Sequence, residues 1–315
     1  CDWSSDVCSS DLHPDGQRKL GYGELAADAA KLAPPEHVRL KDPKQFRLIG
    51  RAAPRQDIPA KVNGSAQFGI DVRVPGMVHA VVVHAPAFGA TVASLPATPA
   101  GALALVNLGN AVGVVASNTW DAMRISNGLK VQWNIPADAA SINSAAILAA
   151  GQSLMATGAP AVVETSGSPD AALAGAAKQI DATYSLPYLA HACMEVLNCT
   201  ASVTPTSCEI WAPTQGQATC VTTAMAITGL TADQITVHTT YLGGGLGRKF
   251  EQDFIAQAVQ ISKAIGKPVK LTWPRAQDFR NDKYRPTALI RVQAGADASG
   301  ALSAMIYRNV SASIA

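Results

Sequence analysis

The segment 241–251 (YLGGGLGRKFE) places four glycines within five positions, between an extended stretch and a helical one. Residues 235–242 are rich in β-branched side chains, and apolar residues recur at helical spacing from 254 to 265. Gly266 ends this helix, and 269–273 predicts another strand. The predicted order is strand, glycine loop, helix and strand. Glycines there leave backbone N–H groups open beside a helix N-terminus, where an anionic or oxo ligand can approach closely.

The spacing of the glycines limits which ligand fits. A dinucleotide-binding loop would need its third glycine at the position of Arg248, and no phosphate-loop pattern ending in Gly-Lys-Ser/Thr is present. The alternative is a glycine-rich turn that binds nothing. We favour a ligand, because ordering four clustered glycines costs a large amount of conformational entropy.

Composition excludes several classes of function. The chain has 315 residues, of which 48% are hydrophobic and 15% charged, so it can bury a core. A net charge of +2 without a basic block argues against nucleic acid as a partner. No apolar run reaches the ~18 residues of a membrane span. The cysteines at 193, 199, 208 and 220 lack iron–sulfur or zinc spacing, so no metal site is predicted from them.

Periodicity and turn residues predict a mixed α/β fold. Strands are expected at 66–71, 78–84, 103–108, 111–116, 130–133, 180–184, 200–203, 208–211, 288–293 and 302–310, in addition to those flanking the glycine loop. Helices are expected at 20–32, 119–129, 141–155 with Ser141 as N-cap, 171–177 and 217–228, in addition to 254–265.

Several separated motifs occur together in one order. They are 187–195 (PYLAHACME), 197–200, 211–215 (WAPTQ), 243–249 (GGGLGRK), 268–273 and 284–286. Together they resemble the molybdopterin-binding large subunit of the xanthine dehydrogenase group of molybdenum hydroxylases, with the isoquinoline 1-oxidoreductase β-subunit type as the nearest branch. The resemblance runs from about residue 20 to the last residue.

The resemblance implies an α/β hammerhead domain followed by a partial molybdopterin-binding α/β domain. The hammerhead is expected at 51–137 and the cofactor-binding part at 169–315, joined by a helix and linker at 138–168 and preceded by a connector with a short helix at 13–50. Residues 1–12 (CDWSSDVCSSDL) look like the translation of a sequencing adapter and are treated as an artefact. The sequence is therefore expected to be a fragment.

The implied function is oxidative hydroxylation of an N-heterocycle or an aldehyde, with water as the oxygen source. The implied cofactor is molybdenum-molybdopterin, with the cytosine dinucleotide form favoured. The implied partners are a small-molecule substrate and a small subunit whose [2Fe–2S] cluster takes the electrons. The family's catalytic glutamate belongs to a segment that this sequence lacks, so no catalytic residue is assigned and the chain alone is expected to be inactive. The alternative is a non-catalytic assembly or binding module with the hammerhead fold, and that glutamate segment in the full gene would discriminate between them.

The resemblance assigns cofactor-binding positions residue by residue. Gln215 falls where the family places a glutamine near the metal, and an amide can donate to an oxo group without changing its charge. The loop contributes Gly244, Gly245, Leu246, Gly247 and Arg248, with Leu246 replacing a usual phenylalanine. Phe250 stands where purine-oxidising members carry a glutamate, which argues for an apolar substrate.

Other polar residues are interpreted as structural. His191 and Glu195 lie in an apolar stretch and are expected to be satisfied hydrogen-bond anchors, although an acid–base pair is the alternative. Asp278, Asp282 and Arg285 are expected to form a loop network that holds Arg285 and the proline after it.

Two cysteines bear on the cellular compartment of the protein. Cys199 and Cys208 would oppose each other in a hairpin whose turn is centred on residues 203–204, close enough for a disulfide. The alternative is two buried thiols that pack as small hydrophobes. A disulfide would favour a periplasmic location over a cytoplasmic one, and the resembled branch is often exported. Any export signal lies outside the sequence.

Overall fold

The computed structural model describes residues 10–12, 17, 19–34, 36–38 and 40–312. They divide into two compact units, Cys1–Asn63 and Gly64–Ala315. Most of the predicted artefact at 1–12, including Cys1 and Cys8, lies outside the described residues.

The first unit contains short elements. Strand β1 (Ser10–Leu12) pairs antiparallel with β2 (Lys19–Gly21), and helix α1 (Tyr22–Ala29) follows. Helix α1 is shorter than the helix expected at 20–32, because residues 19–21 pair with β1, and its start is fixed by a hydrogen bond of 2.7 Å from Gly21 N to Glu24 Oε2. The 3-10 helix η2 (Pro43–Gln45) and α2 (Ile58–Val62) complete the unit.

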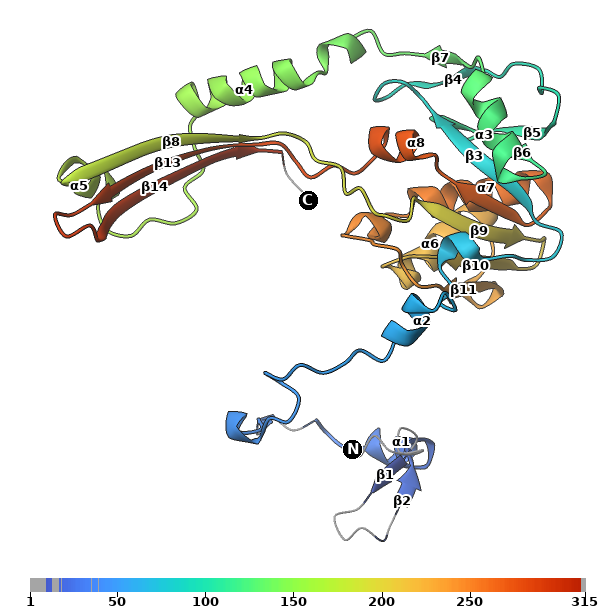
Figure 1. Cartoon of the computed structure of the whole chain (residues 1–315), viewed down its shortest axis with the longest axis horizontal. Coiled ribbons are helices and arrows are strands. Elements are labelled where there is room, and N and C mark those ends of the chain that lie inside the picture. The colour runs from blue at the N-terminus through green and yellow to red at the C-terminus, as the bar shows by residue number, and fades with distance from the viewer. Residues whose placement is uncertain (1–9, 13–16, 18, 35, 39, 313–315) are drawn as a thin grey trace. The chain divides into compact units, whose positions relative to one another are not determined.

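The second unit is built on a seven-stranded sheet with the order β11-β10-β9-β12-β3-β6-β5 (Figure 1). Pairing is parallel for β10 with β11 and for β12 with β3, and antiparallel elsewhere. The strands are β3 (Val78–His84), β5 (Ala102–Asn107), β6 (Ala111–Ala116), β9 (Asn198–Val203), β10 (Cys208–Ala212), β11 (Ile235–Thr239) and β12 (Val269–Thr272). Strands from the predicted hammerhead and cofactor-binding segments thus share one sheet, and the boundaries between those domains stay a prediction.

Helices cover both faces of this sheet. Helices α6 (Gln217–Thr228) and α7 (Asp253–Ile265) pack on the larger core, in which Phe254, Ala258 and Ile261 are fully buried. Helix α7 ends at Gly266 in a left-handed conformation, as its sequence predicts. Helix α3 (Thr119–Gly128) covers a smaller cluster on the other face.

A three-stranded antiparallel sheet and a two-stranded pair complete the second unit. The larger one has the order β14-β13-β8, from β8 (Lys178–Leu186), β13 (Ala288–Ala296) and β14 (Leu302–Ser311). Helices α4 (Ser144–Thr157) and α5 (Pro169–Ala174) contact β13 and β14. The pair joins β4 (Thr91–Ser94) to β7 (Gln132–Asn134). The N-cap of α4 is Asn143, whose Oδ1 accepts from Ala146 N at 3.0 Å, and not the expected Ser141.

The strand expected at 66–71 does not form. Residues Gly69–Asp71 make the 3-10 helix η3 instead, because the chain turns closely over β9 and the segment after β10. A Cβ on Gly69 would lie 2.4 Å from Pro213 Cδ, so only glycine fits there. Helix α8 (Arg275–Arg280), which follows β12 directly, was not expected from the sequence.

The predicted Cys199–Cys208 disulfide is corrected by the register of the hairpin. Its turn occupies 204–207, closed by a 2.9 Å hydrogen bond from Thr204 N to Ser207 O, and Cys208 therefore pairs with Val203. Cys199 lies four residues farther along β9, roughly 13 Å at ~3.3 Å per residue, which is too far for a disulfide. Both residues are buried free thiols, so the structure gives no support to the predicted compartment. Among the described residues, no helix is long and apolar enough to cross a membrane.

We predict that Cys199 and Cys208 are both alkylated when the chain is unfolded without reductant. Burial raises the pKa of the Cys208 thiol to about 11 and that of Cys199 above its usual range, so both should react slowly in the folded chain. Peptide mass spectrometry with and without prior reduction tests this, and the two samples should match. A disulfide-linked peptide pair in the unreduced sample would contradict the register.

Candidate functional site

The glycine loop follows β11 and leads into the 3-10 helix η6 (Arg248–Phe250). Backbone φ is positive at Gly244 (94°), Leu246 (53°) and Gly247 (99°), so the loop reverses direction sharply. Leu246 is one of two non-glycine residues with positive φ among the described residues, and the other is Ala192. Such conformations are costly and occur where the surrounding structure enforces them.

Close contacts require glycine at two loop positions. A Cβ on Gly243 would lie 2.4 Å from Glu195 Cβ, and one on Gly245 would lie 2.4 Å from Gln215 Oε1. The loop therefore packs directly against the segments that carry Glu195 and Gln215, which the sequence places far from it. The loop's glycines serve close packing as well as positive φ.

A buried ion pair fixes the loop. Lys249 Nζ donates to Glu195 Oε2 at 2.6 Å, and the two side chains are 0% and 5% exposed. Glu195 Oε2 also accepts from Gly243 N at 2.9 Å, while Oε1 accepts from Ile70 N at 3.0 Å. In return, Glu195 N donates to Gly243 O at 2.9 Å. The expectation that Glu195 is a satisfied hydrogen-bond anchor agrees with these contacts.

Lys249 also holds the segment that carries Gln215. Its carbonyl accepts from Gln215 N at 2.9 Å and from the hydroxyl of Thr214 at 3.2 Å. The Gln215 side chain points back to the loop, where Oε1 accepts from Gly247 N at 3.1 Å. The Nε2 group of Gln215 donates to no protein atom in the described part of the chain, and the residue is exposed.

Three consecutive N–H groups of the loop lack an acceptor. Within the described residues, the amides of Gly244, Gly245 and Leu246 donate no hydrogen bond, whereas that of Arg248 donates to Gly245 O at 2.8 Å. Leu246 is exposed. Gly244 is partly buried and Gly245 is buried. Successive backbone amides in a turn are the kind of donor that can bind an anion or an oxo group. Together with Gln215 Nε2, they are the donors that this region offers to a ligand.

The structure does not support Arg248 as a ligand-binding residue. Its guanidinium is 1% exposed and donates to both carboxylate oxygens of Asp253, at 2.9 and 2.7 Å. Nε lies 2.8 Å from Asp282 Oδ1 as an ion pair without hydrogen-bond geometry. Burial opposes its charge, but the hydrogen bonds and charge of Asp253 outweigh it and raise the pKa of Arg248. The side chain is committed to holding α7 against the loop.

Asp282 joins His191 to this network. Its carboxylate accepts from His191 N and lies 3.1 Å from His191 Nδ1. His191 Nε2 lies 3.8 Å from the position that a Cβ on Gly247 would occupy, so the imidazole stands beside the loop. The predicted network around Arg285 is corrected, because Asp282 contacts His191 and Arg248, and Asp278 pairs with Arg275 at 2.6 Å.

Phe250 lies beside the loop donors. Its ring packs against Gly216, where a Cβ would be 3.2 Å from two ring carbons, and the side chain is 56% exposed. Phe250 and Leu246 thus give the surface next to Gln215 an apolar character. The structure brings together Gln215, the glycine loop and Phe250, which the sequence analysis assigned to one site.

Sequence reasoning missed the role of Lys249 and the His191–Asp282 contact. Neither pair produces a recognisable sequence spacing, because Lys249 and Glu195 are 54 residues apart and His191 and Asp282 are 91 residues apart. Among the described residues, no three His, Cys, Asp or Glu side chains gather into a group that could hold a metal. The groups that this region offers to a ligand are the hydrogen-bond donors of the loop and of Gln215.

Comparison with known proteins gives consistent results. Residues 155–313 match the molybdopterin cofactor-binding domain family. The chain is 31% identical over 274 residues to isoquinoline 1-oxidoreductase subunit beta of Brevundimonas diminuta, covering 82% of this chain and 34% of that protein. It is 29% identical over 325 residues to a membrane-bound aldehyde dehydrogenase [pyrroloquinoline-quinone] of Gluconacetobacter polyoxogenes, covering 96% and 42%.

Solved structures share the fold. The aldehyde oxidoreductase of Desulfovibrio gigas superimposes with a TM-score of 0.65 at 18% identity, covering 91% of this chain and 37% of that one. The chain therefore spans between about a third and two fifths of the length of these three proteins.

We predict that Lys249→Met lowers the free energy of unfolding by about 3–5 kcal/mol, because it leaves the buried Glu195 carboxylate without its cation. The matched control is Arg291→Met, which breaks an exposed pair with Asp181 whose side chains are 36% and 49% exposed. That change should cost at most about 1 kcal/mol. Urea unfolding of both variants measures the difference, and equal losses would show that Lys249 is not a buried anchor.

Proposed function

Since the chain belongs to the molybdopterin cofactor-binding domain family, we propose that it forms part of a molybdenum-dependent oxidoreductase in which the glycine loop and Gln215 contact the cofactor. The observation that carries this proposal is that, in the described part of the chain, the consecutive amides of Gly244, Gly245 and Leu246 have no acceptor and lie close to Gln215, whose Nε2 also donates to no protein atom. These donors suit a group rich in oxo and anionic atoms.

The hydrogen-bond donors of the loop are chemically suited to molybdopterin. The loop offers neutral N–H groups whose direction the backbone fixes, and the Lys249 and Arg248 charges are already neutralised by carboxylates. An anionic cofactor would therefore meet hydrogen-bond donors without displacing an existing ion pair. A Cβ at Gly245 would collide with Gln215, so substitution there would push the amide out of place.

When bound, molybdopterin-held molybdenum supplies Lewis acidity and accepts electrons from the substrate. The chain's own residues hold the Gln215 amide in position and orient it. Lys249 fixes the carbonyl that holds Gln215 N, and Gly247 N holds the side-chain oxygen, so the amide N–H groups face away from the protein. Donors fixed in this way need no reorganisation when charge develops on a neighbouring oxygen.

We propose an apolar N-heterocycle or an aldehyde as the substrate class. Phe250 and Leu246 are exposed beside Gln215 and offer no charged group to a substrate. Two similar proteins are named for isoquinoline and for an aldehyde, which supports the same pair of classes. A purine would need polar recognition that Phe250 does not provide.

The finer features of the proposal concern the whole enzyme. We propose the cytosine dinucleotide form of molybdopterin, water as the source of oxygen, and a separate small subunit whose [2Fe–2S] cluster takes the electrons. The name of the Brevundimonas relative, a subunit beta, supports a multi-subunit enzyme. The general base is proposed to be a glutamate in a segment that this sequence does not include.

We predict that Gln215→Ala in the intact enzyme lowers kcat by about 10²–10³ and changes KM little. The amide contributes most where charge develops, so its loss should affect turnover more than substrate binding. Gln217→Ala is the matched control, because this glutamine is exposed at the start of α6 only two residues away. Steady-state kinetics at measured molybdenum occupancy test the prediction, and an unchanged kcat at full occupancy would remove Gln215 from the site.

A further inference from the structure

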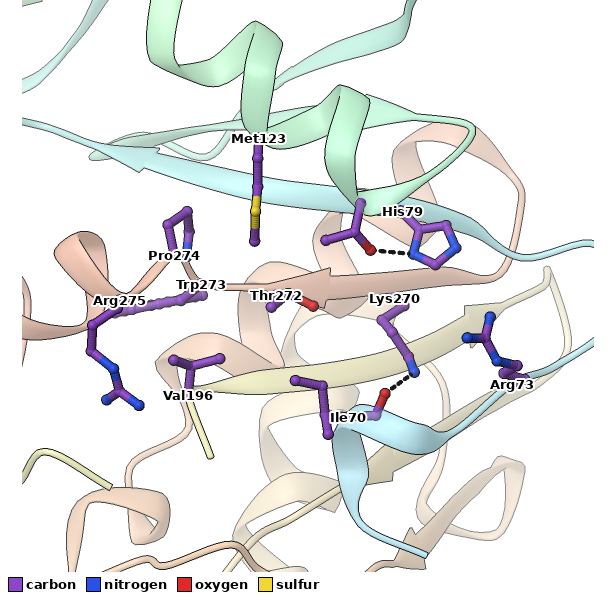
Figure 2. A pocket seen from close by; sticks show the side chains of 11 residues that line it. Ile70, Arg73, His79, Met123, Val196, Lys270, Thr272, Trp273, Pro274 and Arg275 are labelled. Carbon is purple, nitrogen blue, oxygen red and sulfur yellow. Dashed lines mark hydrogen bonds between the residues drawn. The ribbon is translucent and has the colours of Figure 1, made fainter. Parts of the chain in front are cut away.

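A cavity of about 300 Å³ lies between α3, η3 and the neighbouring strands β3 and β12 (Figure 2). Its floor is one face of the seven-stranded sheet, between the two elements that cover that face. Ile70 from η3 and Met123 from α3 form opposite walls. No carboxylate lines the cavity among the described residues.

The sheet register gathers polar side chains on this face of the sheet, of which Lys270 and His79 line the cavity. Lys270 of β12 pairs with His79 of β3 and with Thr200 of β9, so these three side chains project from the same face. Thr200 is fully buried, and its hydroxyl has no hydrogen-bond partner in the described part of the chain. The opposite face of β12 carries Val269 and Leu271, which belong to the apolar core.

Lys270 is a buried cation without a counter-ion. It is 5% exposed, and its Nζ donates to the carbonyl of Ile70 at 2.6 Å. The carboxylates that act on it from a distance are Asp71 and Glu195. Asp71 accepts from Phe68 N, and Glu195 is already paired with Lys249. A buried charge that lacks a close partner is costly unless something else neutralises it.

Two further bases face the same space. Arg73 forms no ion pair among the described residues, and His79 Nδ1 lies 2.9 Å from the hydroxyl of Thr119. Burial and the Arg73 charge lower the pKa of Lys270 to about 8. Burial and the charges of Lys270 and Arg73 also lower the pKa of His79. An anion placed among Lys270, His79 and Arg73 would favour the protonated forms of Lys270 and His79 and would be attracted by the charge of Arg73.

The other end of the cavity is apolar. Figure 2 shows His79, Lys270 and Arg73 on one side, and Met123, Val196 and Pro274 toward the other. Arg275 also lines the cavity, but its guanidinium is already bound to Asp278 and to the carbonyls of residues 193 and 194. The cavity thus has one charged end and one apolar end.

We propose that this cavity binds a small organic anion, with a phosphate or carboxylate group held by Lys270 and Arg73 and an apolar substituent against Met123 and Val196. The site belongs to residues outside the glycine loop and does not depend on the proposed cofactor function. Its volume matches the small end of the range for ligand pockets.

Isothermal titration calorimetry of the 315-residue chain with phenyl phosphate, benzoate, inorganic phosphate and benzyl alcohol tests the proposal. Phenyl phosphate or benzoate should bind more tightly than inorganic phosphate, and the neutral alcohol should not bind. The stronger of the two aromatic anions identifies the preferred oxyanion. If neither binds, or if the alcohol binds equally well, the proposal is overturned.

Variants locate the binding. Lys270→Met should weaken affinity by about 10–100-fold, the loss of a charged hydrogen bond, without lowering the stability of the ligand-free chain. Lys263→Met is the matched control, since this exposed lysine donates to the Ile227 carbonyl at 2.6 Å outside the cavity. Arg73→Met offers an independent variant at an exposed position. Affinity unchanged by both Lys270→Met and Arg73→Met would contradict the site.

The pH dependence gives a second readout. Benzoate keeps its charge above pH 6. The other charged groups that act on Lys270 are Arg73, Asp71 and Glu195, and the pKa of Lys270, about 8, falls between pH 7 and 10. Because the anion prefers protonated Lys270, affinity should fall as pH rises through about 8. A flat profile over this range would exclude Lys270 as the binding group.

Discussion

The buried ion pair between Lys249 and Glu195 organises the candidate cofactor site. Lys249 uses its side chain to bind Glu195 and its carbonyl to hold Gln215, while Glu195 binds the Gly243 amide and Ile70. One pair therefore connects four segments that are distant in sequence, namely those that carry Ile70, Glu195, Gln215 and the glycine loop. A buried pair of this kind adds little net stability compared with apolar packing, but breaking it is expensive. Its role here is to fix the positions of the glycine loop and of Gln215 relative to Glu195.

Neutralising the charges around the loop has a chemical consequence. Arg248 and Lys249 are both buried against carboxylates, so the loop presents backbone amides rather than free cations. The cavity around Lys270 has the opposite character, since that lysine has no close carboxylate. The carbonyl of Ile70 accepts from Lys270 while its amide donates to Glu195, so the backbone of one residue contacts both regions.

The sequence predicted much of the local structure and part of the site. Helix α7 and its left-handed end follow from periodicity and from Gly266, and the grouping of Gln215 with the loop follows from the family motifs. The register of the β9–β10 hairpin was not predicted correctly. Its turn lies two residues later than expected, and this separates Cys199 from Cys208. The contacts of Asp282 with His191 and Arg248 were also missed, since ion pairs between residues distant in sequence leave no periodic signal.

A structure of the intact enzyme with its cofactor bound tests the central claim most directly. The account predicts that the cofactor lies against the loop, with oxygen or sulfur atoms within hydrogen-bond distance, about 3.2 Å for oxygen, of Gln215 Nε2 and of at least one amide among Gly244, Gly245 and Leu246. The Lys249–Glu195 pair should remain intact beneath it. A cofactor bound elsewhere, with these amides facing solvent or other protein segments, would contradict the account.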